Sequence, residues 1–366
     1  MSKTIFICFI IISCVSAQNS GNKLYALHEE EFLNYNEKDE TKGFININEI
    51  IIDKMGQIYI SDYRGGRILK FSNDGKLLKS IGRKGNGPGE FADYFFTRIS
   101  PGNKLYAIMN YMERRDISVF NTEGKYLKRM NLDKLSSFFN ACAMLDDGIA
   151  AVSIRDSFKK PGKKNGFNEY IAILDLNTLN RKIVYNKLEV KDPLGGERFV
   201  NIAEDGNKSF YFALNSKKEY AVFKCNIKGE MIKQITRVFK PVFMKGAYLD
   251  GFRNLIESRK KIYKKFPIDT KQDEDPYFNI INYLAVDSYD NLWAFTSERM
   301  NEEIVSVDMY DKNGNYKKTF YLKGDILGTP RCREYKIYKD CLYYSYNDKQ
   351  GEPHLYRLKL PDEIWK

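Results

Sequence analysis

Residues 49–91 read EIIIDKMGQIYISDYRGGRILKFSNDGKLLKSIGRKGNGPGEF, and this stretch decides the fold. Four short apolar runs alternate with turns rich in glycine and aspartate. The runs are 50–52, 58–60, 68–71 and 77–81. Strands of this length joined by such turns predict a four-stranded antiparallel meander. A glycine-rich loop at 82–89 then leads to the next unit.

The meander recurs along the chain, and a repeat of this length is typical of propellers. We assign the repeats to residues 49–91, 97–132, 139–185, 200–236, 283–322 and 335–358. The last repeat supplies only three strands, whereas the strand-like run at 23–27 belongs to no repeat. An N-terminal strand that completes the last blade leaves no bare sheet edge in a ring. We therefore predict an all-β, six-bladed β-propeller in which residues 23–27 complete the last blade.

The N-terminus has the features of a secretory signal. Residues 1–17, MSKTIFICFIIISCVSA, combine Lys3, an apolar run at 5–12 and small residues before Gln18. In an alternative interpretation Ile11-Ile12-Ser13-Cys14 is a lipobox, and the mature chain begins at a lipidated Cys14. The apolar run is too short for an ordinary transmembrane helix. Either way we expect residues 18–366 to form one extracytoplasmic domain (periplasmic, secreted or lipid-anchored), with the membrane contacted only through Cys14.

Composition supports a large folded core with a basic surface. The 366 residues include 26 Tyr, 24 Phe and only 10 Pro, and the formal net charge is +11. Export argues against nucleic acid as a partner, so this charge would suit polyanionic glycans, anionic lipid head groups or acidic peptides. The alternative is a solvated, lysine-rich surface. The six cysteines show no CxxC spacing, and we expect mostly buried small side chains, not disulfides or a zinc site.

Residues 44–91 and 278–296 resemble a large family of exported six-bladed β-propellers that is distantly related to NHL-repeat propellers. In the first segment the matching residues are Ile52-Asp53, Gly56-Gln57-Ile58-Tyr59-Ile60, Asp62, Arg67-Ile68, Phe71, Gly75 and the loop Ile81-Gly82-Arg83-Lys84-Gly85-Asn86-Gly87-Pro88-Gly89-Glu90-Phe91. In the second they are Val286-Asp287 and Asn291-Leu292-Trp293. The resemblance implies an exported protein, often a lipoprotein, with no assigned reaction.

Long insertions fall on one face of the predicted ring. Turns between strands one and two, and between strands three and four, share one face and are uniformly tight. The opposite, loop-rich face holds the insertions 83–95, 155–169, 191–199, 240–278 and 324–331. Because function concentrates on long loops held by a rigid scaffold, we expect the binding surface there. Its basic candidates are Arg83, Lys84, Lys159, Lys160, Lys163 and Lys164. The alternative is that these loops are tolerated insertions that bind nothing.

The insertion 241–277 contains a predicted helix at 245–266. Its apolar residues recur at helical spacing; they are Tyr248, Phe252, Leu255, Ile256, Ile262, Tyr263 and Phe266. We expect a cap docked on the rim of blades four and five. The alternative is a basic amphipathic helix on a membrane surface.

Catalytic motifs are scarce. The two histidines, His28 and His354, are far apart, and neither HExxH nor GxSxG occurs. His354 falls within a strand run and is expected to be structural. The segment 83–89 lacks the Gly-Lys-Ser/Thr ending of a phosphate loop, so we interpret it as a blade connector whose glycines permit positive φ. The sequence predicts no catalytic residue, no metal site and no cofactor beyond Ca²⁺ at the channel.

Polar residues near the starts of the inner strands form one further candidate site. They are Glu49, Arg98, Asn140, Asn201, Asn282, Arg333 and Glu334. Because inner strands line the central channel, we expect these side chains to converge at its mouth and bind a ligand. The oxygens of Glu49, Asn140, Asn201 and Asn282 would suit Ca²⁺, as in six-bladed lactonase-type enzymes. The alternative is a set of polar channel residues around water.

Three functions follow from this sequence. The first is an exported binding module for a glycan, a peptide or an envelope protein. The second is a metal-dependent hydrolase or lyase with its site at the channel mouth. The third is a structural component of an envelope assembly.

Overall fold

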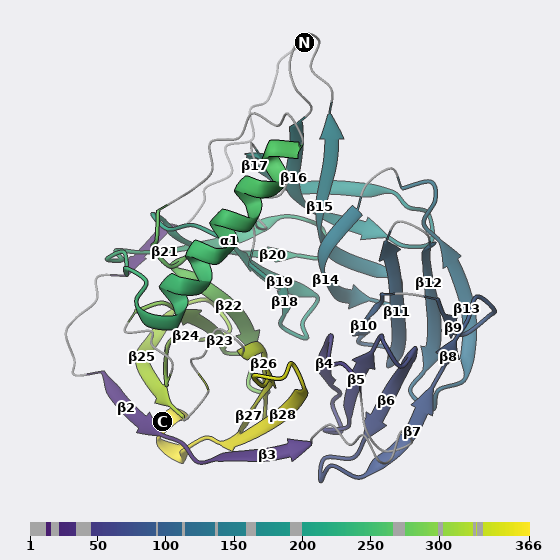
Figure 1. The fold of residues 1–366 in the computed structure, drawn as a ribbon, viewed down its shortest axis with the longest axis horizontal. Coiled ribbons are helices and arrows are strands. Elements are labelled where there is room, and N and C mark those ends of the chain that lie inside the picture. Colours follow the sequence, from purple (N-terminus) through teal and green to yellow (C-terminus); the bar gives the residue numbers. More distant parts are fainter. Residues whose placement is uncertain are drawn as a thin grey trace.

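Six sheets form a ring in the computed structural model, and this confirms the predicted six-bladed β-propeller (Figure 1). Each blade has four antiparallel strands, and two of the sheets gain a fifth, parallel strand at the outer edge. The structure describes residues 12–15, 22–33, 45–92, 94–111, 114–135, 138–158, 166–190, 200–265, 275–298, 303–324, 327 and 332–366. In the first five blades the strands follow chain order from the channel outward.

The strand bounds are as follows. Blade one contains β4 (Ile50–Ile52), β5 (Ile58–Asp62), β6 (Arg67–Phe71) and β7 (Leu77–Ile81). Blade two contains β10 (Phe96–Ile99), β11 (Lys104–Tyr111), β12 (Arg114–Asn121) and β13 (Tyr126–Asn131). Blade three contains β14 (Phe138–Asp146), β15 (Ile149–Phe158), β16 (Gly166–Asp175) and β17 (Arg181–Val190).

The second half of the ring is built in the same way. Blade four contains β18 (Ala203–Glu204), β19 (Ser209–Ala213), β20 (Tyr220–Asn226) and β21 (Met231–Arg237). Blade five contains β22 (Ile281–Val286), β23 (Leu292–Thr296), β24 (Ile304–Tyr310) and β25 (Tyr316–Lys323). Blade six contains β26 (Cys332–Tyr338), β27 (Cys341–Asn347), β28 (Pro353–Lys359) and β3 (Glu29–Leu33). A short 3-10 helix, Asp362–Ile364, follows, and β8 (Arg83–Lys84) and β9 (Glu90–Phe91) form a parallel pair in the glycine-rich loop.

The repeated aspartate of the first tight turn explains why blades one and five match in sequence. Asp53 Oδ1 accepts the backbone N–H groups of Met55 and Gln57, and its Oδ2 accepts the Tyr59 hydroxyl at 3.1 Å. Asp287 does the same in blade five, where Oδ2 accepts the Trp293 indole N–H at 2.8 Å. Each aspartate thus satisfies its turn and also holds the large ring of the second strand.

The hydrophobic core lies between neighbouring blades. Successive side chains of a strand point to opposite faces of its sheet, so each blade packs apolar side chains against the blade on either side. One cluster joins Tyr59 and Ile68 of blade one to Leu105 and Phe120 of blade two. Every member of this cluster is almost completely buried. Each blade therefore depends on its neighbours for burial of its apolar faces.

Lysines on the outer strands of blades one, three and four link these blades to a tight turn of the next blade, and we call these contacts outer-rim links. Lys79 of blade one donates to the Glu123 carbonyl at 2.6 Å, and Lys233 of blade four donates to the Asn313 carbonyl at 3.1 Å. Lys182 of blade three donates to the Lys228 carbonyl in the same manner. Some of the lysines that make the chain basic therefore form structural contacts between neighbouring blades.

An N-terminal strand completes blade six, but it is not the run that we expected. β3 pairs antiparallel with β28, with Leu33 opposite Leu355. The run at 23–27 instead supplies β2 (Lys23–Ala26), which pairs in parallel with β25 as a fifth strand of blade five. β1 (Ile12–Val15), which falls within the predicted signal peptide, pairs in parallel with β21 of blade four.

Helix α1 (Gly246–Lys265) lies between blades four and five in chain order, and in Figure 1 it runs over the part of the ring that holds blade four, toward β16 and β17. Phe243 and Tyr277 form an isolated antiparallel bridge between the two segments that flank the helix. Tyr248 packs edge-on against Phe278, and Ile256 is 7 % exposed, whereas Leu255 of the predicted stripe is 46 % exposed. The described part of the chain contains no helix that is both long and apolar enough to cross a membrane.

The predicted insertion between the second and third strands of blade three is shorter than we expected. Residues 155–169 were expected to be an insertion, but β15 continues to Phe158 and β16 begins at Gly166. Arg155 lies opposite Glu169 and forms an ion pair with it at 2.8 Å. The hairpin extension is polar, so it lacks the apolar alternation from which strands are predicted.

Candidate functional site in the central channel

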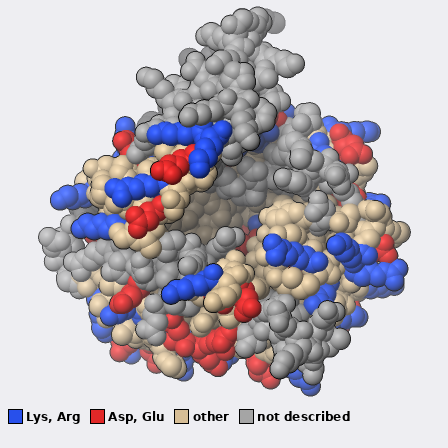
Figure 2. Space-filling model, in the orientation of Figure 1, with Lys and Arg blue, Asp and Glu red and all other residues tan. Residues whose placement is uncertain are grey.

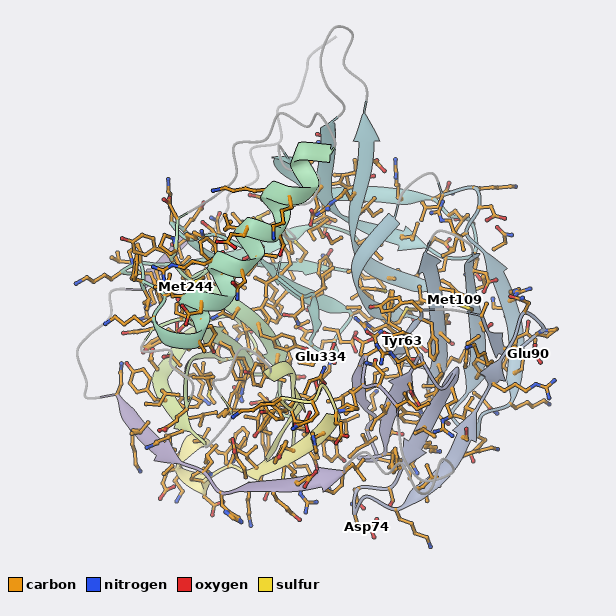
Figure 3. All side chains as sticks on the ribbon, in the orientation of Figure 1. Tyr63, Asp74, Glu90, Met109, Met244 and Glu334 are labelled. Carbon is orange, nitrogen blue, oxygen red and sulfur yellow. The ribbon has the colours of Figure 1, made fainter. Side chains whose placement is uncertain are left out.

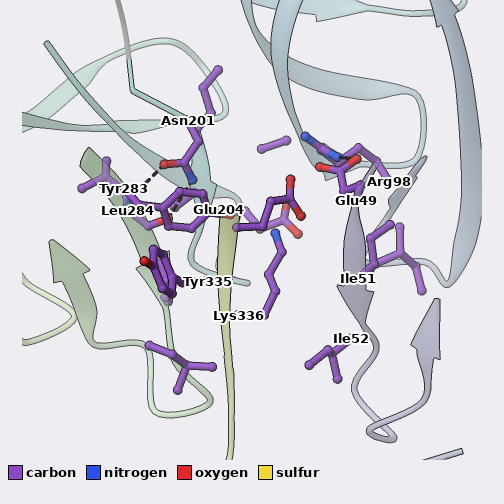
Figure 4. A pocket seen from close by; sticks show the side chains of 18 of the residues that line it. Glu49, Ile51, Ile52, Arg98, Asn201, Glu204, Tyr283, Leu284, Tyr335 and Lys336 are labelled. Carbon is purple, nitrogen blue, oxygen red and sulfur yellow. Dashed lines mark hydrogen bonds and ion pairs between the residues drawn. The ribbon is translucent and has the colours of Figure 1, made fainter. Parts of the chain in front are cut away.

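The inner strands of all six blades enclose a cavity of about 190 Å³ in the central channel. Every blade contributes at least one charged or polar side chain to its lining; among these are Glu49, Arg98, Cys142, Asn201, Glu204, Tyr283, Glu334 and Lys336. Figure 4 shows the labelled side chains of Arg98, Glu49 and Lys336 directed into this space from different strands. The cavity therefore brings together residues that are up to 287 positions apart because each begins an inner strand or lies within one.

Glu49 and Arg98 form a buried ion pair between blades one and two. Glu49 is 3 % exposed, and the Arg98 guanidinium contacts its carboxylate directly. Arg98 also donates to the carbonyls of Thr97 and Cys142. Burial opposes the charge of Arg98, but the Glu49 carboxylate outweighs it and holds the pKa of Arg98 above its usual value.

Glu334 occupies a strained position at the start of blade six. Its backbone φ is +43°, and the pairing of β26 with β27 shifts register between Arg333 and Tyr335. The bulge directs the Glu334 carboxylate to the Ile50 backbone N–H of blade one at 3.0 Å. Burial and the nearby Glu49 carboxylate raise the pKa of Glu334 to about 7.

The inner strands of blades three and five carry register shifts at the corresponding places. The ladder shifts between Phe139 and Ala141 in β14 and between Ile281 and Tyr283 in β22. The skipped residues, Asn140 and Asn282, are both sequence candidates. Asn282 is exposed and does not line the cavity.

Several of the sequence candidates join neighbouring inner strands, and we call these contacts inner-rim links. Arg98 reaches the Cys142 carbonyl, and Glu334 accepts from Ile50. The Asn201 amide donates to the Leu284 carbonyl at 2.7 Å and accepts from the Leu284 N–H at 2.8 Å. These polar groups are therefore engaged in holding the blades together.

The proposed Ca²⁺ ligand set does not fit these contacts. The Asn201 oxygen is bonded to Leu284, and Asn282 lies outside the cavity. Glu49 is paired with a guanidinium, and two cationic groups, Arg98 and Lys336, share the same space. A calcium ion requires six to eight oxygen ligands, so the described residues of this channel do not form such a site.

Sequence analysis missed several cavity residues as site candidates, among them Cys142, Glu204, Tyr283 and Lys336. Glu204 lies between this cavity and a second one of about 110 Å³ toward the tight-turn face, and burial raises the pKa of Glu204 to about 7. Burial also raises the pKa of Tyr283 to about 12. Lys336 loses solvation, but Tyr283, Glu334 and Glu49 outweigh this loss and raise the pKa of Lys336, so it stays protonated.

The remaining candidates lie elsewhere. Arg83 and Lys84 are exposed in the glycine-rich loop at the outer rim, where the Arg83 guanidinium contacts Glu90 at 2.7 Å. Lys159, Lys160, Lys163 and Lys164 lie outside the described residues, and only the backbone of Asn140 and Arg333 is described. On the face bearing α1, Figure 2 shows basic side chains interspersed with acidic ones, which fits a solvated basic surface.

The cysteines behave as small buried side chains where the structure describes them. Cys142, Cys225 and Cys341 carry free thiols, and the first two are buried. Burial raises the pKa of Cys142 to about 12, so this thiol is not a nucleophile at neutral pH even though it lines the cavity.

Comparisons with known proteins agree on the fold. The profile of the family DUF5128, described as a six-bladed beta-propeller, matches residues 10–316. A crystal structure of a DUF4221 family member from Bacteroides vulgatus is similar with a TM-score of 0.59 and 14 % identity, covering 92 % of this chain and 98 % of that one. No curated protein sequence matches this chain.

Two further solved structures are more distant. The luciferin-regenerating enzyme has a TM-score of 0.46 and 12 % identity, covering 91 % of this chain and 95 % of that chain. The calcium-binding protein regucalcin from Agrobacterium tumefaciens has a TM-score of 0.45 and 11 % identity, covering 93 % of this chain and 97 % of that chain. At such identities and TM-scores these two similarities carry no argument about this chain.

Proposed function

Because this chain belongs to the DUF5128 family of six-bladed β-propellers, we propose that it is an exported binding module and not a calcium-dependent enzyme. Its ligand is a glycan, a peptide or a protein of the envelope, received on the loop-rich face. The observation that carries the proposal is the charged cavity at the channel, lined from all six blades. Fold similarity alone does not assign a function, so the cavity itself has to support it.

The cavity favours a ligand group that accepts hydrogen bonds. Among the described residues, Lys336 and Tyr283 bring polar groups into the cavity without a bond to a neighbouring blade. Lys336 is protonated, and burial raises the pKa of both Glu204 and Glu334, which favours their neutral forms. A carboxylate, a carbonyl or a sugar hydroxyl would pair with Lys336, and a volume of about 190 Å³ admits one side chain or one sugar unit.

The test is a combined glycan and peptide array probed with the wild-type chain and with two matched variants. Lys336→Gln removes the ammonium group from the cavity, and Lys339→Gln removes the same charge from the exposed tight turn that follows. We expect the wild type and Lys339→Gln to share their strongest signals and Lys336→Gln to lose them by at least about tenfold. Equal signals from all three proteins would contradict binding at the channel.

The alternative enzyme function has its own readout. If the chain hydrolysed lactones or esters in a metal-dependent manner, turnover would appear with added Ca²⁺ and would disappear with a chelator. Sustained turnover of this kind, together with an array free of specific signals, would favour the hydrolase over the binding module.

A further inference from the structure

A second cluster of polar side chains lies on the hairpin between β27 and β28, at the outer part of blade six. Asp348 and Glu352 flank the turn, and His354 is the second residue of β28. Each offers one ligand atom, and these atoms lie within 4.8 Å of one another. The central cavity contains none of these residues.

A turn of nearly the same sequence in blade five shows what is unusual here. Residues 311–315 read DKNGN and residues 348–352 read DKQGE. Asp311 Oδ1 accepts the Asn315 N–H at 2.8 Å, and Asp348 Oδ1 accepts the Glu352 N–H at 2.7 Å. The two turns therefore have the same backbone hydrogen bonds around their first aspartate.

The fifth residue changes the chemistry of the turn. In blade five the Asn315 amide donates to Asp311 Oδ2 at 3.0 Å. In blade six the same position is Glu352, and an ionised carboxylate has no proton to donate. Two carboxylates thus face one another in blade six, and a cation between them would relieve their repulsion.

His354 is oriented for metal binding by the strand that closes the ring. Its Nδ1 contacts the Glu31 carboxylate of β3 at 2.6 Å. A carboxylate on one imidazole nitrogen fixes the tautomer and leaves the other nitrogen as a ligand, which is the usual arrangement of metal-bound histidine. The other nitrogen, Nε2, is shielded from solvent and has no hydrogen-bond partner among the described residues.

The spacing of the two nearest ligand atoms also fits one ion. His354 Nε2 lies 3.6 Å from Asp348 Oδ2, which is too long for a hydrogen bond. Two ligands bound at Zn²⁺ distances with tetrahedral geometry lie about 3.4 Å apart. A nitrogen and two carboxylate oxygens form a donor set that suits Zn²⁺ better than Ca²⁺.

We propose that Asp348, Glu352 and His354 bind a divalent transition-metal ion, with Zn²⁺ as the best fit and water completing the coordination. Glu31 positions His354 and does not contact the metal. Figure 2 shows acidic side chains gathered at the edge of the ring where Figure 1 places β3, and these attract a cation to this edge. Because Glu31 belongs to β3, metal binding also ties the closing strand to the hairpin.

The test is calorimetric titration of the untagged full chain with Zn²⁺, paired with thermal melting. We expect one Zn²⁺ per chain and a higher melting temperature with Zn²⁺. His354→Ala and Asp348→Asn should each weaken binding at least about tenfold and abolish the thermal shift. Glu31→Gln should weaken binding by about tenfold, as removal of a positioning carboxylate does. Asp311→Asn, in the matched turn of blade five, should bind Zn²⁺ like the wild type.

Three results would overturn the proposal. The first is a wild-type affinity for Zn²⁺ that is no higher than the affinity of the double variant Asp311→Asn/His354→Ala. The second is a preference for Ca²⁺ over Zn²⁺, which the imidazole ligand excludes. The third is an equal loss in Asp311→Asn and Asp348→Asn. Circular dichroism of each variant without metal separates a folding defect from a lost ligand, and Asp348→Asn keeps the turn hydrogen bonds because asparagine also accepts them.

Discussion

The inner and outer rims of this propeller join the same neighbouring blades with opposite chemistry. At the outer rim, exposed lysines such as Lys79 and Lys182 donate to turn carbonyls of the next blade. At the inner rim, half-buried groups such as Arg98 and Asn201 donate to strand carbonyls of the next blade beside a cavity. An exposed link competes with water, whereas a buried polar group that loses its partner is not resolvated. We therefore expect the inner-rim links to contribute more to the stability of the ring than the outer-rim links do. The same inner strands also line the candidate ligand site.

Figure 3 makes the same contrast visible, since side chains fill the ring while Glu334 lies near its centre and Glu90 and Asp74 lie at its periphery. Asp74 belongs to an exposed turn, where the Ser72 hydroxyl lowers the pKa of its carboxyl. Glu334 has the opposite shift because burial disfavours its charge. For these two carboxylates, burial and hydrogen bonding thus shift the pKa in opposite directions.

The largest effect is expected from opening the ring. A chain truncated through residue 33 lacks β3, whereas a chain truncated through residue 27 lacks β2 but keeps β3. Because β3 is the fourth strand of blade six, we expect the longer truncation to cost on the order of 5 kcal/mol more than the shorter one. Urea denaturation of the two proteins measures the difference. Equal midpoints would contradict closure by β3.

The next largest effect concerns the buried pair of the inner rim. Arg98→Met leaves Glu49 buried and without its cation, so we expect a loss of about 3 to 5 kcal/mol in the free energy of unfolding. The double variant Arg98→Met/Glu49→Gln removes the stranded charge as well and should recover at least about half of that loss. A double variant no more stable than the single one would show that the pair has no such coupling.

A pH dependence follows from Glu204. Its pKa is raised from 4.5 to about 7 in the folded state, so the folded chain binds more protons than the unfolded chain between these values. The burial penalty of Glu204 is therefore absent below about pH 4.5 and fully present above about pH 7. Glu204→Gln should become more stable than the wild type as pH rises through this window, by on the order of 2 kcal/mol. Parallel stability curves for the two proteins would contradict the shift.

The smallest effect is expected at the outer rim. Lys79→Met and Lys182→Met each remove one exposed donor to a turn carbonyl, and we expect each to change the free energy of unfolding by less than about 0.5 kcal/mol. Thermal melts beside Arg98→Met measure the contrast directly. Losses as large as those at Arg98 would mean that both rims contribute equally.

The sequence predicts the six blades because the turn chemistry is local. Asp53 and Asp287 each mark a first tight turn, and the same spacing to Tyr59 and Trp293 is visible in the chain. The strand that closes the ring was misassigned because its pairing partners are distant in the chain and leave no local signal in the sequence. The run at 23–27, KLYAL, is mostly apolar, whereas β3 begins with three glutamates whose partners lie more than 300 residues away.

The candidate site was predicted only in part. Glu49, Arg98, Asn201 and Glu334 do line the cavity, because polar residues at the start of an inner strand face the channel. Asn282 does not, because a bulge in β22 displaces it, and a bulge depends on pairing with the neighbouring strand. Lys336 was missed because a lysine within a strand run has no local mark that it points inward.

The most direct measurement of the central claim is a crystal structure of the full chain with the strongest ligand from the array. We expect the ligand to occupy the channel cavity on the face bearing α1, with an acceptor atom within hydrogen-bond distance of Lys336 Nζ. We also expect the inner-rim links at Arg98 and Asn201 to stay intact. A ligand seated on the tight-turn face, or only on the outer surface of the blades, would contradict the account.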